Sequence, residues 1–263
     1  IFKNKIPNDC IPNIIISCGR KSVYLSLYLK KKYPDLVNIH IQNPKISAKN
    51  FSYIIAPNHD NLTGNNIINS TGALHQFKVA KTNKDYYDLE NNNLVSCIIG
   101  GENNHYIFTE KETEILCDKI LELKKRNPKF EFLIITSRRT NSNIKKILKN
   151  RLGSNFKLWL GEGKNPYSYA IYNSKYFIIT SDSTSMISEA SSSGMPIYVY
   201  YLPPKRKSIR FERFHNEFTK LNIIRDLIST NNLEIWSYNK LNETKRIAGI
   251  IKERIIQGID ETR

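Results

Sequence analysis

The chain has 263 residues, of which 40% are hydrophobic, and its formal net charge at pH 7 is +16. This length suits two small α/β domains, and no apolar run is long enough to cross a bilayer, which argues against a membrane-spanning helix. The positive charge predicts an anionic partner: nucleotide phosphates, acidic lipid headgroups or nucleic acid. We expect a cytoplasmic protein that can associate peripherally with the inner face of a membrane.

The four cysteines, Cys10, Cys18, Cys97 and Cys117, have no spacing typical of a metal site or a disulfide framework. We expect reduced thiols, in keeping with a cytosolic protein. Because the chain opens at Ile1 rather than at Met, we expect a fragment or a trimmed chain.

An N-terminal α/β domain is predicted over residues 1–82. Its expected strands cover 13–17, 37–41, 53–56 and 66–68, and its expected helix covers 21–32. Gly19, at the turn from strand to helix, would let the backbone approach a ligand closely, and Arg20 would add positive charge. A tight turn with a solvated arginine explains the same residues.

The strand over 53–56 delivers His59 and Asp60 at its carboxyl end, where ligands gather in parallel sheets. An imidazole titrates near neutrality, so His59 is a candidate general base, and Asp60 is the carboxylate that could assist it. The alternative is an ordinary turn built from asparagine, histidine and aspartate.

A polar linker is predicted over 83–93, followed by a second domain over 94–235. The expected strands cover 94–99, 131–136, 157–160, 177–180 and 197–201, and the expected helices cover 111–125, 141–149, a segment from 166, and 186–193. Five strands separated by helices predict a parallel, doubly wound sheet. A last helix over 241–257, within a C-terminal segment 236–263, is expected to pack across the domain boundary.

The loops that follow the strands of the second domain should share one edge of its sheet. They carry the candidate residues Gly100, Gly101, Ser137, Arg138, Arg139, Gly161, Asn165, Pro166, Asp182, Ser183, Thr184 and Ser185. The two arginines could clamp a diphosphate, and the turn at 182–185 starts a helix whose free N–H groups favour an anion. Glu189, one turn along, could accept hydrogen bonds from ribose or sugar hydroxyls. A solvated basic turn and an ordinary helix cap explain the same residues.

Seven short motifs run through the chain: SCGRK (17–21), APNHD (56–60), TGALH (71–75), IGG (99–101), TSRRT (136–140), NPY (165–167) and SDSTSMISEA (181–190). This series resembles the bacterial branch of the mitochondrial-fission elongated-mitochondria family. Residues 165–201 also resemble the donor-binding half of GT-B glycosyltransferases, including the peptidoglycan N-acetylglucosaminyltransferases.

The resemblance implies a GT-B-like α/β fold, with two Rossmann-like domains facing a cleft and an incomplete N-terminal domain. It further implies that Ser183, Thr184, Ser185 and Met186 meet the donor phosphates and that Glu189 meets the ribose. Gly161, Asn165, Pro166 and Tyr167 would lie near the base.

The leading hypothesis is a glycosyltransferase-like protein that binds a nucleotide-diphosphate sugar and transfers the sugar to an unknown acceptor, for which a lipid-linked molecule is one candidate. No Asp-x-Asp motif is present, so we expect no metal and no cofactor, with Arg138, Arg139 and the helix dipole in place of Mg²⁺.

The rival hypothesis is a non-catalytic, membrane-associated adaptor that keeps the fold. Lys205, Arg206, Lys207 and Arg210 could contact acidic lipid or simply be solvated. Nucleic acid is not an expected partner, because charge is its sole support.

Overall fold

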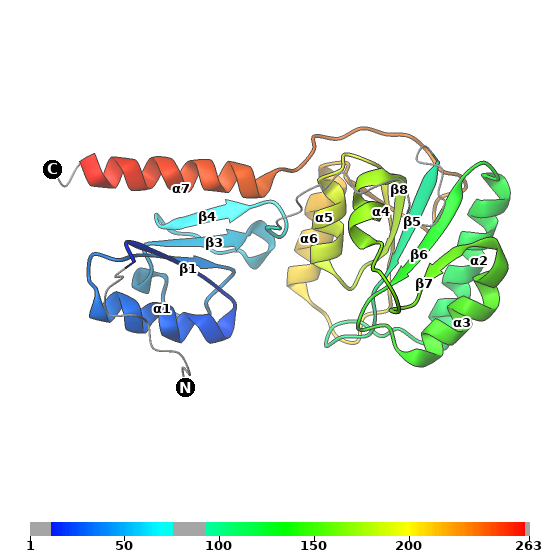
Figure 1. Ribbon diagram of the computed structural model, residues 1–263, viewed down its shortest axis with the longest axis horizontal. Helices are drawn as coiled ribbons and strands as arrows, with labels where there is room; N and C mark the ends of the chain where they lie inside the picture. The colour runs from blue at the N-terminus through cyan, green and yellow to red at the C-terminus, as the bar shows by residue number, and fades with distance from the viewer. Residues whose placement is uncertain (1–11, 76–92, 261–263) are drawn as a thin grey trace. The chain divides into compact units, whose positions relative to one another are not determined.

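The computed structural model describes residues 12–75 and 93–260, which belong to two compact units. The first unit comprises Ile1–Thr71 and Lys245–Arg263, and the second comprises Gly72–Thr244 (Figure 1). The chain therefore leaves the first unit after Thr71 and returns to it at Lys245. The predicted linker over 83–93 lies almost entirely outside the described residues and stays a prediction.

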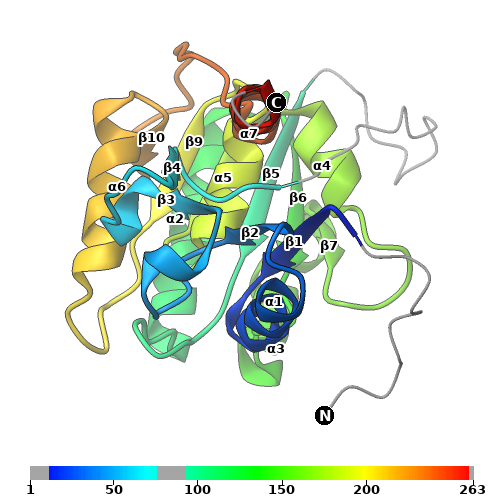
Figure 2. The same cartoon turned by 90° about the vertical axis from the view of Figure 1, so that its left-hand side faces the viewer.

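The first unit is built on a parallel sheet in the order β1-β2-β3-β4. The strands are β1 (Ile14–Cys18), β2 (Val37–Ile41), β3 (Tyr53–Pro57) and β4 (Ile67–Ser70), and α1 (Arg20–Lys32) packs on β1 and β2 (Figure 2). Val23 of α1 is buried with Phe51, Ile54 and Ile67 in a small apolar core. The four strands and the helix that the sequence predicts are confirmed within one or two residues.

The C-terminal helix α7 (Glu243–Asp260) is bound to the first unit by two arginines. Arg246 donates to the carbonyl of Asn69 at 2.7 Å, and Arg254 donates to the carbonyl of Asn65 at 3.1 Å. Both acceptors lie at or next to β4. That this helix also packs across the domain boundary stays a prediction.

The second unit contains a six-stranded parallel sheet in the order β10-β9-β8-β5-β6-β7. The strands are β5 (Leu94–Ile99), β6 (Glu131–Thr136), β7 (Lys157–Trp159), β8 (Ser174–Thr180), β9 (Ile197–Tyr200) and β10 (Ile224–Asp226). The helices are α2 (Glu110–Arg126), α3 (Ser142–Leu152), α4 (Tyr167–Asn173), α5 (Thr184–Ser191) and α6 (Ile209–Lys220). The predicted doubly wound sheet is confirmed.

Helices cover both faces of this sheet, so the central strands are apolar on both sides (Figure 1). On one face, Cys97 of β5 packs with Ile120 of α2 and Leu148 of α3. On the other face, Ile98 packs with Ile187 of α5. Neighbouring residues of one strand thus serve two cores, which explains the unbroken apolar run that predicted β5.

The prediction of five strands in this unit was incomplete, because the sheet gains β10 through the helix α6. Phe211, Phe214 and Phe218 recur at helical spacing and are buried, and Ser208 is the N-cap residue. The charge run that precedes them concealed this pattern. β10 has three residues, too few to give a period of its own.

Lowering the pH from about 7.5 to about 5.5 is expected to reduce the free energy of unfolding, because a solvated imidazole has a pKa of about 6.5. Burial lowers the pKa of His40, His75 and His105 in the folded chain. Within this window the unfolded chain therefore binds protons that the folded chain does not. Urea unfolding at the two pH values measures the change.

The variant His40→Asn separates this effect from general acid sensitivity. His40 is fully buried, and its Nδ1 lies 2.8 Å from the Ser17 hydroxyl. An asparagine side chain carries an amide atom at the position of Nδ1 and does not titrate. The variant should lose less stability on acidification than the natural chain. An equal loss in both proteins would contradict the role of this imidazole.

Candidate functional site

The carboxyl ends of three neighbouring strands meet at the side chain of Asp182, which is 2% exposed. Its Oδ1 accepts a hydrogen bond from the Thr180 hydroxyl at 2.6 Å. Its Oδ2 accepts from the Gly101 amide at 3.1 Å and from the Arg139 guanidinium at 2.6 Å. Because β8, β5 and β6 are adjacent in the sheet, one carboxylate joins the loops that follow all three strands.

Burial raises the pKa of Asp182, and the Thr180 hydroxyl, the Arg139 charge and the Gly101 amide oppose that rise. Three donors on one carboxylate favour the ionised form at neutral pH. The Asp182 carboxylate is thus a buried acceptor that fixes the loops around it.

Gly100 and Gly101 are glycines for steric reasons. A Cβ at Gly100 would lie 2.2 Å from the Asp182 carboxylate oxygens. A Cβ at Gly101 would lie 2.2 Å from the backbone oxygen of Arg139. The loop after β5 therefore approaches the loops after β8 and β6 more closely than any side chain permits.

Two hydrogen bonds from backbone amides fix the turn after β6, which carries Arg139. The Ser137 amide donates to the Ile99 carbonyl at 2.8 Å, and the Arg139 amide donates to the Ser137 hydroxyl at 3.1 Å. The Arg139 side chain is 40% exposed although one of its nitrogens bonds to Asp182. A guanidinium carries five N–H donors, so Arg139 can hold Asp182 and still meet a ligand. Arg138, beside it, is exposed.

The helix α5 begins at Thr184, two residues earlier than predicted, so Thr184 and Ser185 lie in its first turn. Ser183 is the N-cap, and its hydroxyl accepts from the Met186 amide at 3.4 Å. Ser185 is exposed, whereas Thr184 and Met186 are half-buried. The first turn of α5 therefore presents backbone N–H groups and a hydroxyl, as an anion requires.

A second contact joins the segment 161–167 to α5. The Tyr167 hydroxyl donates to the Glu189 carboxylate, and the Asn165 side chain accepts from the Tyr167 amide at 2.9 Å. Burial raises the pKa of Glu189, and the hydrogen bond from Tyr167 opposes the rise. Pro166 is buried, and Gly161 has a φ of 109°, a backbone conformation that favours glycine.

The remaining candidates belong to the first unit. Gly19 has a φ of 79° and precedes Arg20, the exposed first residue of α1. His59 is 2% exposed and Asp60 is half-buried in the short helical turn Asn58–Asp60. Each of these residues follows a strand, as the sequence predicts. Their catalytic and donor-binding roles stay predictions.

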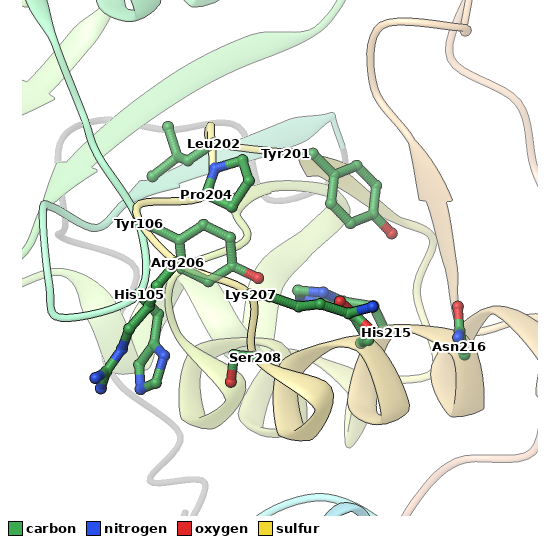
Figure 3. Close-up of a pocket in the computed structure, with 11 residues that line it drawn as sticks. His105, Tyr106, Tyr201, Leu202, Pro204, Arg206, Lys207, Ser208, His215 and Asn216 are labelled. Atoms are coloured by element: carbon green, nitrogen blue, oxygen red, sulfur yellow. The ribbon is translucent and has the colours of Figure 1, made fainter.

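A cavity of about 630 Å³ in the second unit has none of the predicted site residues in its lining (Figure 3). It lies between the loop after β5, the loop after β9 and the helix α6, and its lining includes His105, Tyr106, Arg206 and Lys207. The sequence showed Arg206 and Lys207 as part of a charge run. The helical spacing of the phenylalanines in α6 was the signal that could have placed them at a helix start.

Among residues 12–75 and 93–260, no three histidine, cysteine or acidic side chains gather closely enough to hold a metal ion. The helices of these same ranges are all too short or too polar to cross a membrane.

Residues 2–255 match the family described as Mitochondrial fission ELM1. The chain belongs to the ELM1 family. Protein RP120 of Rickettsia prowazekii (strain Madrid E) is 32% identical over 296 residues, which cover 95% of this chain and 83% of that protein. Mitochondrial fission protein ELM1 of Arabidopsis thaliana is 25% identical over 277 residues, covering 93% of this chain and 64% of the plant protein. This ELM1 chain thus spans less than two thirds of the plant relative.

Solved structures of nucleotide-sugar enzymes share the fold of this ELM1 protein. A putative UDP-N-acetylglucosamine 2-epimerase from Listeria monocytogenes superimposes with a TM-score of 0.60 at 14% identity, covering 93% of this chain and 75% of its own. The UDP-GlcNAc 2-epimerase from Methanocaldococcus jannaschii gives 0.57 at 12% identity, covering 92% and 77%. These identities are low and show the fold. The predicted GT-B-like α/β fold is confirmed.

Proposed function

We propose that this ELM1 protein binds a nucleoside-diphosphate sugar at the carboxyl edge of the sheet in its second unit and transfers the sugar to an acceptor. The observation that carries the proposal is the junction at Asp182. The Asp182 carboxylate bonds to the Arg139 guanidinium, and the loop that holds Asp182 leads directly into the first turn of α5. One aspartate thus connects a cation to a helix start, a combination that suits a diphosphate.

The other residues take roles around that diphosphate. Arg138 and the Ser185 hydroxyl add donors, and Glu189 accepts hydrogen bonds from the ribose hydroxyls one helical turn away. The segment 161–167 lies near the base. As the bond to the sugar breaks, charge develops on the departing diphosphate, and preorganised cations stabilise that charge.

Two structures with the same fold support this ligand class. UDP-GlcNAc 2-epimerase from Neisseria meningitidis was solved bound to UDP-GlcNAc, with a TM-score of 0.52. The Methanocaldococcus jannaschii enzyme was solved with UDP-GlcNAc and UDP, with a TM-score of 0.54. His59 and Asp60 are the proposed base on the acceptor side, and the net charge of +16 favours an acceptor that carries phosphate, such as a lipid-linked one.

Substituting Arg139 with alanine is expected to weaken binding of UDP or GDP about tenfold to a hundredfold, since a hydrogen bond to a charged group contributes about 1.5–3 kcal/mol. Isothermal titration with UDP, GDP and their sugars measures the affinity. Arg126→Ala is the matched control, because it removes an arginine that is also ion-paired, to Glu122 at 2.7 Å, at the far end of α2.

The control should bind as the natural chain does. If the natural chain binds no nucleotide or nucleotide sugar in this panel, the donor role is wrong. If Arg139→Ala and Arg126→Ala weaken binding equally, the effect is one of net charge. Incubation with the bound sugar nucleotide and detection of released nucleoside diphosphate then tests turnover.

The second candidate function is a membrane-associated adaptor, which the strong positive charge favours. The loop after β9 contains three consecutive exposed cations, Lys205, Arg206 and Lys207. Sedimentation with vesicles that contain acidic lipid separates the two functions. Vesicle binding that survives both Arg139→Ala and Glu189→Ala, in a protein that binds no nucleotide sugar, would favour the adaptor.

A further inference from the structure

The cavity beside α6 has walls that are fixed by backbone hydrogen bonds. The Ile107 amide donates to the Pro203 carbonyl at 2.9 Å, and the Lys205 amide donates to the His105 carbonyl at 2.7 Å. The loop after β5 is thus tied to the loop after β9 on both sides of Tyr106. The cavity is a preformed feature of the second unit, about 630 Å³ in volume, which suits a small-molecule ligand.

Four rings line this cavity, those of His105, Tyr106, Tyr201 and His215, and the ring of Phe211, which is not part of the lining, packs against three of them. The His105 ring lies 5.1 Å from the Phe211 ring, and Phe211 lies 6.2 Å from His215, which lies 5.2 Å from Tyr201. Tyr106 meets the same Phe211 edge to face at 5.0 Å. Tyr201 is 40% exposed, so its ring is accessible from solvent. Such rings suit contact with the face of a ligand ring.

Two cations line the cavity where the loop after β9 enters α6, together with Ser208, the N-cap residue of α6. The Arg206 side chain extends toward His105, and the Lys207 side chain extends toward His215 (Figure 3). The Ser208 side chain makes no capping hydrogen bond, so its hydroxyl does not occupy the first amides of this helix. Within the described part of the chain, the buried Nδ1 of His105 also makes no hydrogen bond.

Two further polar side chains line the cavity, one acidic and one uncharged. Glu212 and Asn216, one turn apart on α6, present acceptors and donors suited to hydroxyl groups. The charges nearest the cavity are therefore mixed: cations at the helix start and a carboxylate one turn farther on. A simple phosphate would use only the first set, and a neutral sugar only the second.

We propose that this cavity is a second ligand site, which binds a phosphorylated sugar or polyol ring. Arg206 and the first turn of α6 hold the phosphate, and the His105 Nδ1 supplies a further polar contact. The aromatic side chains of the lining lie against the ligand ring, and Glu212 and Asn216 bind its hydroxyls. The lining adjoins the proposed donor site, since the Leu202 amide donates to the Ser181 hydroxyl at 3.0 Å, but it shares no residue with that site, which uses Arg139 and α5, so variants of each can be tested separately.

Calorimetric titration of the full chain with glucose 6-phosphate, glucose and inorganic phosphate tests the proposal. Glucose 6-phosphate should bind more tightly than either of the other two probes. Arg206→Ala should weaken that binding by about tenfold, as expected for the loss of a charge-assisted hydrogen bond. Tyr201→Ala should weaken binding of glucose 6-phosphate but leave that of inorganic phosphate unchanged.

Lys205→Ala is the matched control. Lys205 neighbours Arg206 and carries the same charge, but it pairs with Glu102 at 2.9 Å and is not part of the cavity lining. This variant should bind glucose 6-phosphate as the natural chain does. Equal weakening by Lys205→Ala and Arg206→Ala would overturn the proposal. So would a natural chain that binds none of the three probes and none of the vesicles described next.

The vesicle arm distinguishes a soluble ligand from a lipid headgroup of the same chemistry. Phosphatidylcholine vesicles with a minor fraction of phosphatidylinositol 4-phosphate present a phosphorylated ring at a membrane surface. Vesicle binding that Arg206→Ala abolishes and Lys205→Ala preserves, without binding of glucose 6-phosphate, would assign the site to a lipid headgroup. Arg139→Ala should leave all of these interactions intact, whatever the outcome for nucleotide sugars.

A spectroscopic signal reports on the site directly. In the free protein, burial and the nearby charges of Arg206 and Arg210 lower the pKa of His105. A bound phosphate would offset those charges, so the pKa of His105 should rise when glucose 6-phosphate is added, as measured by imidazole NMR. A pKa that does not change at saturating ligand would place the ligand elsewhere.

Discussion

Gly101→Ala is expected to lower the free energy of unfolding by roughly 3 kcal/mol, at the upper end of the usual range for overpacking. The added methyl would lie 2.2 Å from the backbone oxygen of Arg139, and a backbone atom cannot move aside as the end of a flexible side chain can. The loop after β5 would have to shift, which would lengthen the bond from the Gly101 amide to Asp182. Urea unfolding measures the loss of stability.

Gly249→Ala is the control for this substitution. Gly249 is exposed inside α7, and a Cβ there would meet nothing within 4 Å. Alanine is favoured over glycine in a helix interior by about 1 kcal/mol, so the control should be as stable as the natural chain or more stable. Equal destabilisation by both substitutions would show that the close approach at Gly101 is not the cause.

Asp182→Ala is expected to destabilise the protein by about 3 kcal/mol and to weaken nucleotide binding as well. It removes the acceptor of three donors: the Thr180 hydroxyl, the Gly101 amide and the Arg139 guanidinium. Loss of one partner from a buried ion pair costs about 3–5 kcal/mol, and we take the lower value because Arg139 is 40% exposed and water can solvate it. Asp182→Asn keeps the volume but removes the charge that pairs with Arg139, and it should cost less.

Glu122→Ala is the matched control for this loss of a carboxylate. Glu122 also bonds to two cations, Lys119 and Arg126, but it does so at the protein surface, where solvent screens the charges. Its removal should change the urea midpoint far less than Asp182→Ala does. If the two variants are equally stable, the Asp182 junction does not hold the three loops together.

The substitution of Asp182 also tests whether this residue positions Arg139 for nucleotide binding. If Arg139 owes its position to Asp182, then Asp182→Asn should weaken nucleotide binding even where the protein stays folded. A folded Asp182→Asn variant with natural affinity would mean that Arg139 is held by other contacts or does not meet the ligand.

Local sequence patterns determined most of the second unit. The runs 94–99 and 177–180 predict strands that are buried on both faces, because a parallel sheet covered by helices needs no polar alternation. The Gly-Gly pair, the arginine pair and the serine-rich turn each follow such a strand. Since parallel strands end at one edge, their order in the sequence was enough to predict that these loops gather there.

Tertiary structure decided what those residues do. That Asp182 belongs to the donor site stays a prediction, and its carboxylate accepts hydrogen bonds from partners that lie 43 and 81 positions away in the sequence. Likewise, Glu189 shares its carboxylate with Tyr167, and Arg206 lines a cavity with His105. Hydrophobic period and capping residues are local signals, so the sequence determined the strands, the helices and the edge at which their loops meet. The partners of each charged side chain depend on which strands lie side by side, and that neighbourhood exists only once the chain has folded.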